Sequence, residues 1–599
     1  MFILGISAWY HDAAASLLHD GQLVAAAEEE RFTRVKHDAR FPAHAVEYCL
    51  REAGIGPDQI DYVGFYEKPW RRFGRLAATH VDYAPSGFAS FAATVPPWLR
   101  EKLGIGGRLR RALGGHNKVV FTEHHEAHAA SAFLPSPYRS SAILVVDGVG
   151  EWATATFGVG QDNTVDLYEE LRFPHSLGLL YSAFTYYLGF RVNSGEYKIM
   201  GLAPYGEPRY VQTILDQVLD LRDDGSFRLD MRFFDYCNGL TMTAPAFDRL
   251  FGGKPRRPDE PITTRHMDVA RSIQDVTNEC VLRMGRYVHR RTGQQHLCLA
   301  GGVALNCVAN AALLREGPFE HIWIQPAAGD AGGAVGAAFS VWHQYLGKNR
   351  CGCAEDRMRG AFLGPEYSES AIECFLAAHG IPHSRVAPDA LVDHVANRLA
   401  AGEVVGWFQG RMEFGPRALG NRSILGDPRS PTMQARMNAK IKFRESFRPF
   451  APAVLESRVQ DYFDLACPSP YMLLTAPVHP DQRVAVDEHR VQGFDRMNVM
   501  RSRIPAVTHV DGSARVQTVA RADNPRFYAL LERFGAMTGV PVLVNTSFNL
   551  RGEPIVCSPE DAYRCFCRSG IDCLVLGEHV IDRAHLPGVS DDQGPAALD

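Results

Sequence analysis

Two histidines one helical turn apart are the residues of this sequence whose types and spacing best suit chemistry. The stretch His124-His125-Glu126-Ala127-His128 follows a short apolar segment, 119–121, and precedes the helix-favouring segment 129–133. A helix here puts His124 and His128 on one face, where two imidazoles and a carboxylate from elsewhere suit a divalent metal. With 23 His in 599 residues, roughly one such pair arises by chance, so the surroundings must decide its meaning.

Asp147 and Asp330 are the carboxylates that could complete such a site. Residues 141–146 are apolar enough for a buried strand, which delivers Asp147 into a glycine turn. Asp330 follows a further predicted strand, 322–326, and opens the glycine-rich run 329–338. Ligand-binding acids are common at strand-to-helix turns of α/β folds, and the alternative role for Asp330 is a helix N-cap. Because other glycine turns lie upstream, we favour ligand binding.

One of these upstream turns follows the segment 297–300. That segment reads as a buried strand that breaks into Gly301 and Gly302, and a helix is expected to start near Asn306. Glycine lets the chain approach a bound ligand closely, and the N–H groups of the following helix then face that ligand.

A second group of chemistry-bearing residues lies late in the chain, in two segments rich in arginine. Residues 410–423 and 438–452 place Arg and Lys beside Gly, Pro and Phe rather than among matching acids. Arg offers planar bidentate donors for phosphate or carboxylate, and Lys offers a compact charge. Scattered surface ion pairs are the alternative, but an anion pocket explains the composition better. Residues 509–515 and 542–549 would close that pocket.

The beginning of the chain could hold phosphate. Residues 2–8 and 13–18 read as strands around a sharp turn, and Asp20-Gly21 predicts a hairpin to a third strand over 22–27. Backbone N–H groups in such turns can cradle phosphate. The run 28–37 mixes both charges, for which we predict a solvated surface.

Length and composition limit the class of protein. At 599 residues the chain is too long for one core, so we expect two domains, 1–350 and 351–599, divided at the polar residues 347–359. A net charge of −5 argues against nucleic-acid binding through global charge. No signal peptide or bilayer-spanning stretch is recognised, and the 13 Cys form no paired Cys-x-x-Cys sets. A cytoplasmic protein with reduced thiols is the simplest expectation.

The remaining segments are mostly predicted helices. We expect helices over 42–53, 267–292, 366–380 and 391–401, and a strand over 404–408. Residues 67–118 are interpreted as a helical insertion with a solvated basic face, rather than as a lid or a partner surface. Its cations are Arg71, Arg72, Arg75, Arg108, Arg110 and Arg111.

The order of these motifs resembles the NodU/CmcH-type family of antibiotic and natural-product O-carbamoyltransferases over nearly the whole chain. The matching motifs are His11 in its turn, His124–His128, Asp147-Gly148 and the segments 195–203, 300–306, 329–333, 509–515 and 542–549. The resemblance implies an α/β protein with an N-terminal domain of the actin-like ATPase fold, similar to the threonylcarbamoyl transferases that act on tRNA. It also implies a YrdC-like α/β domain at the C-terminal end.

The resemblance further implies roles for individual residues. The implied metal ligands are His124, His128, Asp147 and Asp330. Iron(II) is the implied metal, although magnesium, manganese or zinc would also suit these ligands. The implied nucleotide-binding residues are Lys36, Asp147, Gly148, Gly301, Gly302, Asn306, Asp330 and Gly333. Carbamoyl phosphate and its adenylate are expected at Arg417, Lys442, Arg448, Arg515, Asn545 and Ser547. The expected catalytic residues are His11, Lys442 and Arg417.

The implied reaction has two stages and uses ATP. Carbamoyl phosphate first yields carbamoyl-adenylate and pyrophosphate in the C-terminal domain, and a hydroxyl of a small-molecule acceptor then takes the carbamoyl group in the N-terminal domain. His11 would accept the proton of that hydroxyl, since imidazole titrates near neutral pH. We expect no nucleic-acid or membrane partner, and a homodimer is left open.

Two other functions would also use residues of these types. A threonylcarbamoyl-type tRNA-modifying enzyme is disfavoured by the low basicity and by the lack of an appended RNA-binding motif. A non-catalytic actin-like nucleotide-binding protein is disfavoured by the presence of both the metal residues and the arginine pocket. A hydrogenase-maturation enzyme should carry an acylphosphatase-like domain and Cys-x-x-Cys zinc sites, neither of which is recognised. No residue identifies the acceptor.

Overall fold

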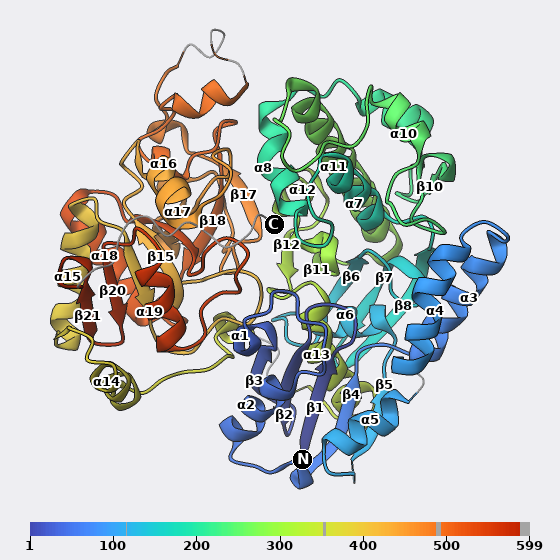
Figure 1. Ribbon diagram of the computed structural model, residues 1–599, viewed down its shortest axis with the longest axis horizontal. Coiled ribbons are helices and arrows are strands. Elements are labelled where there is room, and N and C mark those ends of the chain that lie inside the picture. Colours follow the sequence, from blue (N-terminus) through green and yellow to red (C-terminus); the bar gives the residue numbers. More distant parts are fainter. Residues whose placement is uncertain (103, 116, 351–354, 487–490, 492, 587–599) are drawn as a thin grey trace. The chain divides into compact units, whose positions relative to one another are not determined.

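The chain forms two compact units in a computed structural model (Figure 1). The structure describes residues 1–599 except 103, 116, 351–354, 487–490, 492 and 587–599. Unit 1 contains Met1–Ala26 and Ala39–Arg357, and unit 2 contains Ala27–Asp38 and Met358–Asp599. The division therefore follows Arg357, whereas the expected boundary at 350–351 adjoins residues outside the described part.

Unit 1 contains two five-stranded sheets with the same order of strands. The first, in the order β3-β2-β1-β4-β5, is built from β1 (Phe2–Ser7), β2 (Ala14–His19), β3 (Gln22–Glu28), β4 (Ile60–Phe65) and β5 (Lys118–Phe121). The second, in the order β12-β11-β6-β7-β8, is built from β6 (Ser140–Val146), β7 (Ala153–Gln161), β8 (Thr164–Arg172), β11 (His296–Ala300) and β12 (His321–Ile324).

The strand directions repeat as well. In each sheet the central strand pairs antiparallel with the next strand of its hairpin, β1 with β2 and β6 with β7. It pairs parallel with a later strand on its other side, β1 with β4 and β6 with β11. Parallel strands need a crossover connection, and helices occupy those connections. Unit 1 is thus a duplicated α/β arrangement of mixed sheets, with the predicted Asp20-Gly21 hairpin in the first copy.

The helices of unit 1 fill the connections between these strands. Their bounds are α2 (Ala43–Ala53), α6 (His124–Phe133), α7 (Leu177–Tyr187), α8 (Glu196–Leu202), α9 (Val211–Thr213), α10 (Pro245–Leu250), α11 (Thr264–Thr292), α12 (Cys307–Glu316) and α13 (Asp330–Phe339). A small two-stranded sheet joins β9 (Leu219–Leu221) and β10 (Phe227–Leu229).

Helices α6 and α13 pack directly on each other and carry the two ends of the candidate metal site. Their close approach needs glycine, because a Cβ on Gly336 of α13 would lie 1.7 Å from the backbone oxygen of Ala127 in α6. Helix α13 also packs on β1 and β2, so His124, His128 and Asp330 are held by buried elements.

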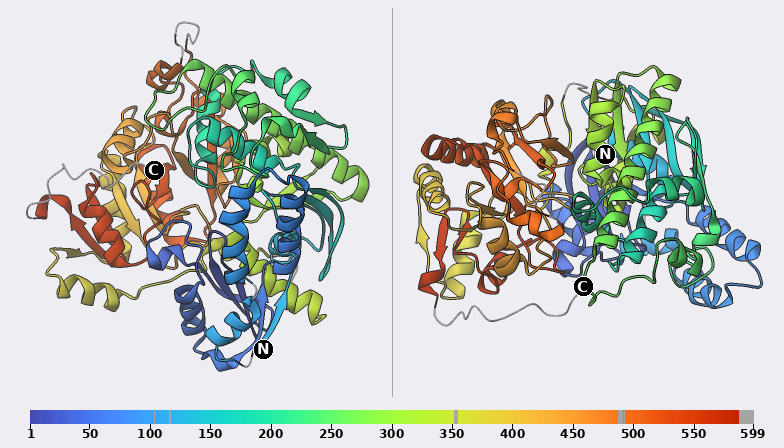
Figure 2. Two further views of the ribbon diagram at one scale, coloured as in Figure 1. Left: turned by 45° about the vertical axis from the view of Figure 1, so that its right-hand side comes forward. Right: turned by 90° about the horizontal axis from the view of Figure 1, so that it is seen from above.

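The insertion at 67–118 is helical, as expected, but its basic face is only partly solvated. It forms α3 (Pro69–Asp82), α4 (Phe88–Lys102) and α5 (Ile105–Ala112), and α3 packs along α4 (Figures 1 and 2). Arg110 and Arg111 are exposed, whereas Arg72 and Arg75 are 7% and 5% exposed. The prediction is wrong for these two arginines, because aromatic rings and a buried carboxylate of unit 1 cover them.

Unit 2 is built on a nine-stranded mixed sheet in the order β13-β21-β20-β14-β15-β19-β16-β18-β17. The strands are β13 (Ser384–Arg385), β14 (Val405–Phe408), β15 (Arg422–Gly426), β16 (Ala451–Leu455), β17 (Leu474–Pro477), β18 (Ser513–Val519), β19 (Val542–Ser547), β20 (Cys573–Leu576) and β21 (His579–Asp582). The helices are α14 (Glu369–Ala378), α15 (Pro388–Ala400), α16 (Met433–Met437), α17 (Val459–Tyr462), α18 (Pro525–Thr538) and α19 (Pro559–Cys567). Helices α15 and α18 bury apolar side chains against the sheet around Trp407.

The segment Ala27–Asp38, called the strap below, corrects the prediction of a solvated surface over 28–37. Its helix α1 (Glu30–Thr33) is short, and Glu28, Glu29, Glu30 and Arg31 are 2–7% exposed. The charges are buried because they pair with each other and with unit 2 backbone groups, which local composition does not reveal.

None of the helices in the described part of the chain is both long and apolar enough to cross a membrane.

Candidate functional site

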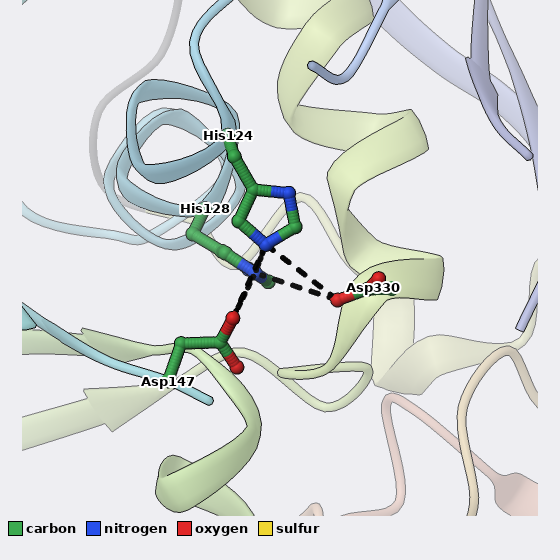
Figure 3. Close-up of side chains that lie close together, drawn as sticks. All are labelled: His124, His128, Asp147 and Asp330. Atoms are coloured by element: carbon green, nitrogen blue, oxygen red, sulfur yellow. Dashed lines mark hydrogen bonds and ion pairs between the residues drawn. The ribbon is translucent and has the colours of Figure 1, made fainter. Parts of the chain in front are cut away.

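Four buried side chains meet where α6, the end of β6 and the start of α13 come together (Figure 3). His124 Nε2 lies 3.1 Å from His128 Nε2 and 3.2 Å from an Asp147 oxygen. An Asp330 oxygen lies 3.6 Å from His124 Nε2 and 3.9 Å from His128 Nε2. Each of the four residues is at most 8% exposed. The sequence expectation that these residues form one cluster agrees with their positions.

The spacing of these atoms fits a metal ion at their centre. Ligand atoms about 2.1 Å from a tetrahedral ion lie about 3.4 Å from one another, and the measured separations run from 3.1 to 3.9 Å. Two imidazoles and two carboxylates suit several divalent metals, so the donors do not identify one. Asp330 does not cap α13, whose N-cap is Gly329 without a side-chain hydrogen bond, so the N-cap alternative is wrong.

The charges of the cluster are strongly coupled. Burial disfavours protonation of His124, but the Asp330 and Asp147 carboxylates outweigh it and raise the His124 pKa to about 9. Burial and the neighbouring His124 lower the pKa of His128 to about 3. At neutral pH the proton on His124 therefore offsets one of the two carboxylate charges. A divalent cation would neutralise the same charges and replace that proton.

Asp147 also connects the cluster to the glycine turn after β11. Its other oxygen accepts a hydrogen bond of 2.8 Å from the Gly302 N–H. Gly301 has φ +89°, and a Cβ there would lie 2.3 Å from the Val146 oxygen, so only glycine fits beside the strand that ends at Asp147. The glycine turn and the four-residue cluster are therefore connected through the Asp147 carboxylate.

The other expected nucleotide-binding residues of unit 1 lie at several places. Gly148 follows Asp147 and its carbonyl accepts from the Ser176 hydroxyl. Asn306 caps α12 by accepting from the Ala309 N–H, and it also pairs with Gln274. Gly333 lies inside α13 against the Tyr66 ring. Of these three, only Gly148 directly adjoins the metal cluster.

His11 lies beside the cluster rather than in it. Its Nε2 is 3.8 Å from an Asp330 oxygen, and its Nδ1 bonds to Asp12 at 2.9 Å. Burial opposes its protonation, but Asp330 and Asp12 raise the His11 pKa well above its usual value. A quarter of the side chain is exposed, so His11 can reach a ligand from the open side of the cluster.

The residues expected to hold carbamoyl phosphate lie in unit 2 and are together called the anion pocket below: Arg417, Lys442, Arg448, Arg515, Asn545 and Ser547. Lys442 is 4% exposed and donates to the Ser547 oxygen at 2.7 Å and to Asn549 Oδ1 at 2.6 Å. Burial and the neighbouring Arg444 and Arg448 cations hold the Lys442 pKa well below its usual range. A bound anion would favour the charged form of this lysine.

Asn545 connects the strand β19 to the loop that carries Arg417. Its amide donates to the Ala418 oxygen at 3.2 Å and to Gln517 Oε1 at 2.7 Å. Gln517 donates in turn to the Leu419 oxygen at 2.8 Å. Arg515 precedes Gln517 by two residues on β18 and so shares its face of the strand. Arg448 pairs with Glu445 at 3.7 Å.

The buried carboxylate of Glu413 binds the backbone of the loop that carries Arg417. One of its oxygens accepts from the N–H groups of Leu419, Asn421 and Arg422 at 2.7, 2.9 and 3.2 Å. The carboxylate is 3% exposed, and three N–H donors around one oxygen fix the path of the chain between Arg417 and Arg422.

The strap holds the other end of this loop. The Gly415 N–H donates to Glu28 at 3.0 Å, and the Gly415 oxygen accepts from Arg31 at 2.9 Å. Arg31 also pairs with Glu28 at 2.6 Å and with Glu30. Two residues of the strap thus bind both the backbone N–H and the backbone oxygen of Gly415, two positions before Arg417.

Several of these residues were missed or placed elsewhere by the sequence analysis. Lys36, expected in the nucleotide site of the N-terminal domain, belongs to the strap and so to unit 2, where its charge helps to lower the Lys442 pKa. Asn549 was visible as an amide two residues after Ser547. Glu28, Arg31 and Glu413 carry no local signal, because their partners are distant backbone groups.

Comparison with known proteins identifies the family of this chain. Residues 2–339 match the sequence-family model "Carbamoyltransferase N-terminus", and residues 396–583 match "Carbamoyltransferase C-terminus". The uncharacterized protein sll1178 of Synechocystis sp. is 56% identical, covering 99% of this chain and 98% of that protein. Nodulation protein NolNO of Sinorhizobium fredii is 38% identical, covering 96% and 79%. Nodulation protein NolO of Bradyrhizobium diazoefficiens is 38% identical, covering 76% and 78%. The chain belongs to the carbamoyltransferase family and is a transferase enzyme.

Proposed function

We propose that the chain is an ATP-dependent O-carbamoyltransferase with a separate site for each half of its reaction. Unit 2 would form carbamoyl-adenylate in the anion pocket, and unit 1 would pass the carbamoyl group to a hydroxyl of a small-molecule natural product. The observation that carries the proposal is the buried His124, His128, Asp147 and Asp330 cluster in a carbamoyltransferase that also has a buried lysine pocket.

The folds expected for the two sites are part of this proposal. The duplicated sheets of unit 1 support an actin-like ATPase arrangement, in which nucleotide binds among the turns that follow the central strands. A YrdC-like arrangement is proposed for unit 2, whose mixed sheet carries the anion pocket on β18, β19 and the adjoining loops. Domains of 1–350 and 351–599 remain the proposed division, with the strap added to the second.

In the anion pocket, the cations would offset charge on phosphoryl oxygens. Carbamoyl phosphate would lose phosphate to water, and the carbamate oxygen would then attack the α-phosphorus of ATP, so that a P–O bond forms and pyrophosphate leaves. Lys442 and Arg417 would stabilise the charge that builds up on these oxygens. Lys442 is already held by Ser547 and Asn549, so little reorganisation is needed.

In unit 1, the acceptor hydroxyl would attack the carbonyl carbon of the adenylate, a C–O bond would form and AMP would leave. A divalent metal at the four-residue cluster, proposed to be iron(II), would supply Lewis acidity and charge neutralisation when bound. A cation bound to Asp330 would remove the negative charge that most raises the His11 pKa, and neutral His11 would then take the proton of the hydroxyl on Nε2, the nitrogen that faces Asp330. Asp12, bonded to Nδ1, would hold the imidazole in orientation.

The experiment separates the two partial reactions. We expect Lys442→Ala to lower pyrophosphate release from ATP and carbamoyl phosphate by about 100-fold or more, while Lys440→Ala, an exposed neighbour in the same segment, keeps the rate. His124→Ala should keep pyrophosphate release but stop carbamoyl transfer to a panel of hydroxylated natural products. If both reactions survive either change, the assignment of two sites is wrong.

A further inference from the structure

The insertion of unit 1 buries an arginine that makes no direct ion pair with any residue the structure describes. Arg75 on α3 is 5% exposed, and within the described residues it has neither an ion pair nor a side-chain hydrogen bond. The ring of Phe173 lies 4.9 Å from its Cζ. Because buried charges are normally paired, such a guanidinium is a candidate for binding an anion that comes from outside the protein.

The groups around Arg75 carry both signs of charge. Arg72, one turn earlier on the same face of α3, is 7% exposed and pairs with the buried Glu67. Glu67 and Glu151 favour the charged form of Arg75, but burial and the neighbouring Arg72 outweigh them. The pKa of Arg75 is lowered to about 10, so it remains charged at neutral pH. The face of the Phe173 ring attracts the cation. It does not accept hydrogen bonds from the N–H groups, which point outward in the plane of the guanidinium.

The neighbour of Arg75 on α3, Arg72, contacts the turn that carries His11. The Arg72 Cζ lies 4.1 Å from the centre of the Tyr10 ring, and the centres of the Tyr10 and His11 rings are 4.4 Å apart. His11 in turn faces Asp330 at 3.8 Å. Arg108 of α5 lies over the Trp9 ring at 5.1 Å, so a second helix of the insertion contacts the same turn.

We propose that Arg75, positioned by Arg72 and Phe173, binds an oxyanion of the acceptor, so that the acceptor is a hydroxylated acid bearing a carboxylate or a phosphate ester. The proposal rests on the proposed function for the identity of the reaction. The guanidinium fork suits both oxyanions bidentately. A cationic acceptor such as an amino sugar would meet repulsion at the same place.

The first test needs no activity. Thermal unfolding of the full-length protein is measured with and without inorganic phosphate at constant ionic strength. Without phosphate, Arg75→Met should melt higher than the wild type, by about 2 °C or more, because a buried guanidinium without a direct ion pair is gone. Phosphate should raise the melting temperature of the wild type and of Arg110→Met, an exposed control on α5, by more than that of Arg75→Met. Arg75→Lys, which keeps the charge, should retain part of this response. Equal responses to phosphate, or a lower melting temperature of Arg75→Met, would overturn the proposal.

The second test identifies the source of the oxyanion. Transfer from carbamoyl phosphate and ATP is measured with D-glucose, D-glucuronate and D-glucose 6-phosphate as probes. The wild type should prefer an anionic probe by about tenfold or more over glucose, and Arg75→Met should lose the preference with an unchanged KM for ATP. An Arg75 effect on the KM for ATP instead would assign the oxyanion to the nucleotide and refute the acceptor proposal. Transfer to the three probes without preference would refute it too. Absence of pyrophosphate release in the wild type would count against the proposed function, while the phosphate-dependent melting would still test the Arg75 site.

Discussion

Replacing Arg31 with methionine tests how the strap governs the anion pocket. The guanidinium holds the Gly415 oxygen at 2.9 Å and pairs with Glu28 and Glu30, all with little exposure to solvent. Methionine keeps most of the volume and removes every one of these contacts. Glu28 and Glu30 then lose the cation that they share in the interior of unit 2.

The expected loss follows from the burial of these groups. Breaking a buried pair by removing one partner costs about 3–5 kcal/mol, because the remaining charge stays buried. Detachment of the strap limits the loss, since it would return both carboxylates to water. Detachment would also break the bonds from Arg34 to the Pro554 and Ile555 oxygens, at 2.7 and 2.6 Å. We therefore expect the free energy of unfolding of unit 2 to fall by about 3 kcal/mol.

The catalytic effect is measured separately from stability. A loosened Gly415 displaces Arg417, and a displacement of about 1 Å can lower a rate about 100-fold. Pyrophosphate release should therefore fall by about 10- to 100-fold at a temperature where the protein remains folded. The control Arg436→Met removes an arginine–Asp572 pair of unit 2 that does not touch the loop. It should leave pyrophosphate release unchanged.

A triple variant distinguishes positioning from stability. Arg31→Met with Glu28→Gln and Glu30→Gln removes the buried charges together, so most of the stability should return. The grip on Gly415 stays lost, and pyrophosphate release should stay low. A wild-type rate in either Arg31 variant would refute the idea that the strap positions Arg417.

Three further outcomes are expected. Metal affinity should rise about tenfold per pH unit from 7 to 9 and then level off, since metal must displace the His124 proton, whose pKa is about 9; calorimetric titration with manganese or zinc checks this. In chelator, thermal melts should show stability decreasing from pH 6.5 to 9, because the folded-state pKa of His124 lies above its unfolded value and the stabilisation by its proton is lost as pH rises through the folded pKa. Gly301→Ala should destabilise unit 1 by about 1–3 kcal/mol and weaken metal binding, as its Cβ would meet the Val146 oxygen and shift the Gly302 N–H away from Asp147; a chain that melts and binds metal like the wild type would contradict this.

The elements nearest the metal cluster could be predicted because their signals are local. The i, i+4 spacing of His124 and His128 placed both on one helix face, and apolar segments ending in acid and glycine located β6 and β11. The helix expected over 267–292 is α11, Thr264–Thr292, and the helix expected near Asn306 is α12 with Asn306 as its N-cap. Periodicity and capping decide such segments without help from the rest of the chain.

The strap and the insertion could not be predicted in the same way. The composition of 28–37 is that of a solvated surface, and the partners that allow Arg31 to be buried include the backbone of Gly415, 384 residues later. Arg72 and Arg75 are buried for a similar reason, since Tyr10 and Phe173 come from distant turns. A charge is buried or exposed according to its partners in space, which a local window does not contain.

The membership of residues 27–38 in unit 2 has a consequence for cutting the chain. A fragment starting at Met358 would lack the peptide that fills its own interior, so it should fold poorly by itself. Supplying the dodecapeptide of residues 27–38 in solution should restore order to that fragment, in the manner of an enzyme rebuilt from complementing pieces. The coding sequences of the two units are therefore interleaved. Exchanging one unit between relatives would require residues 27–38 to be exchanged together with the rest of unit 2.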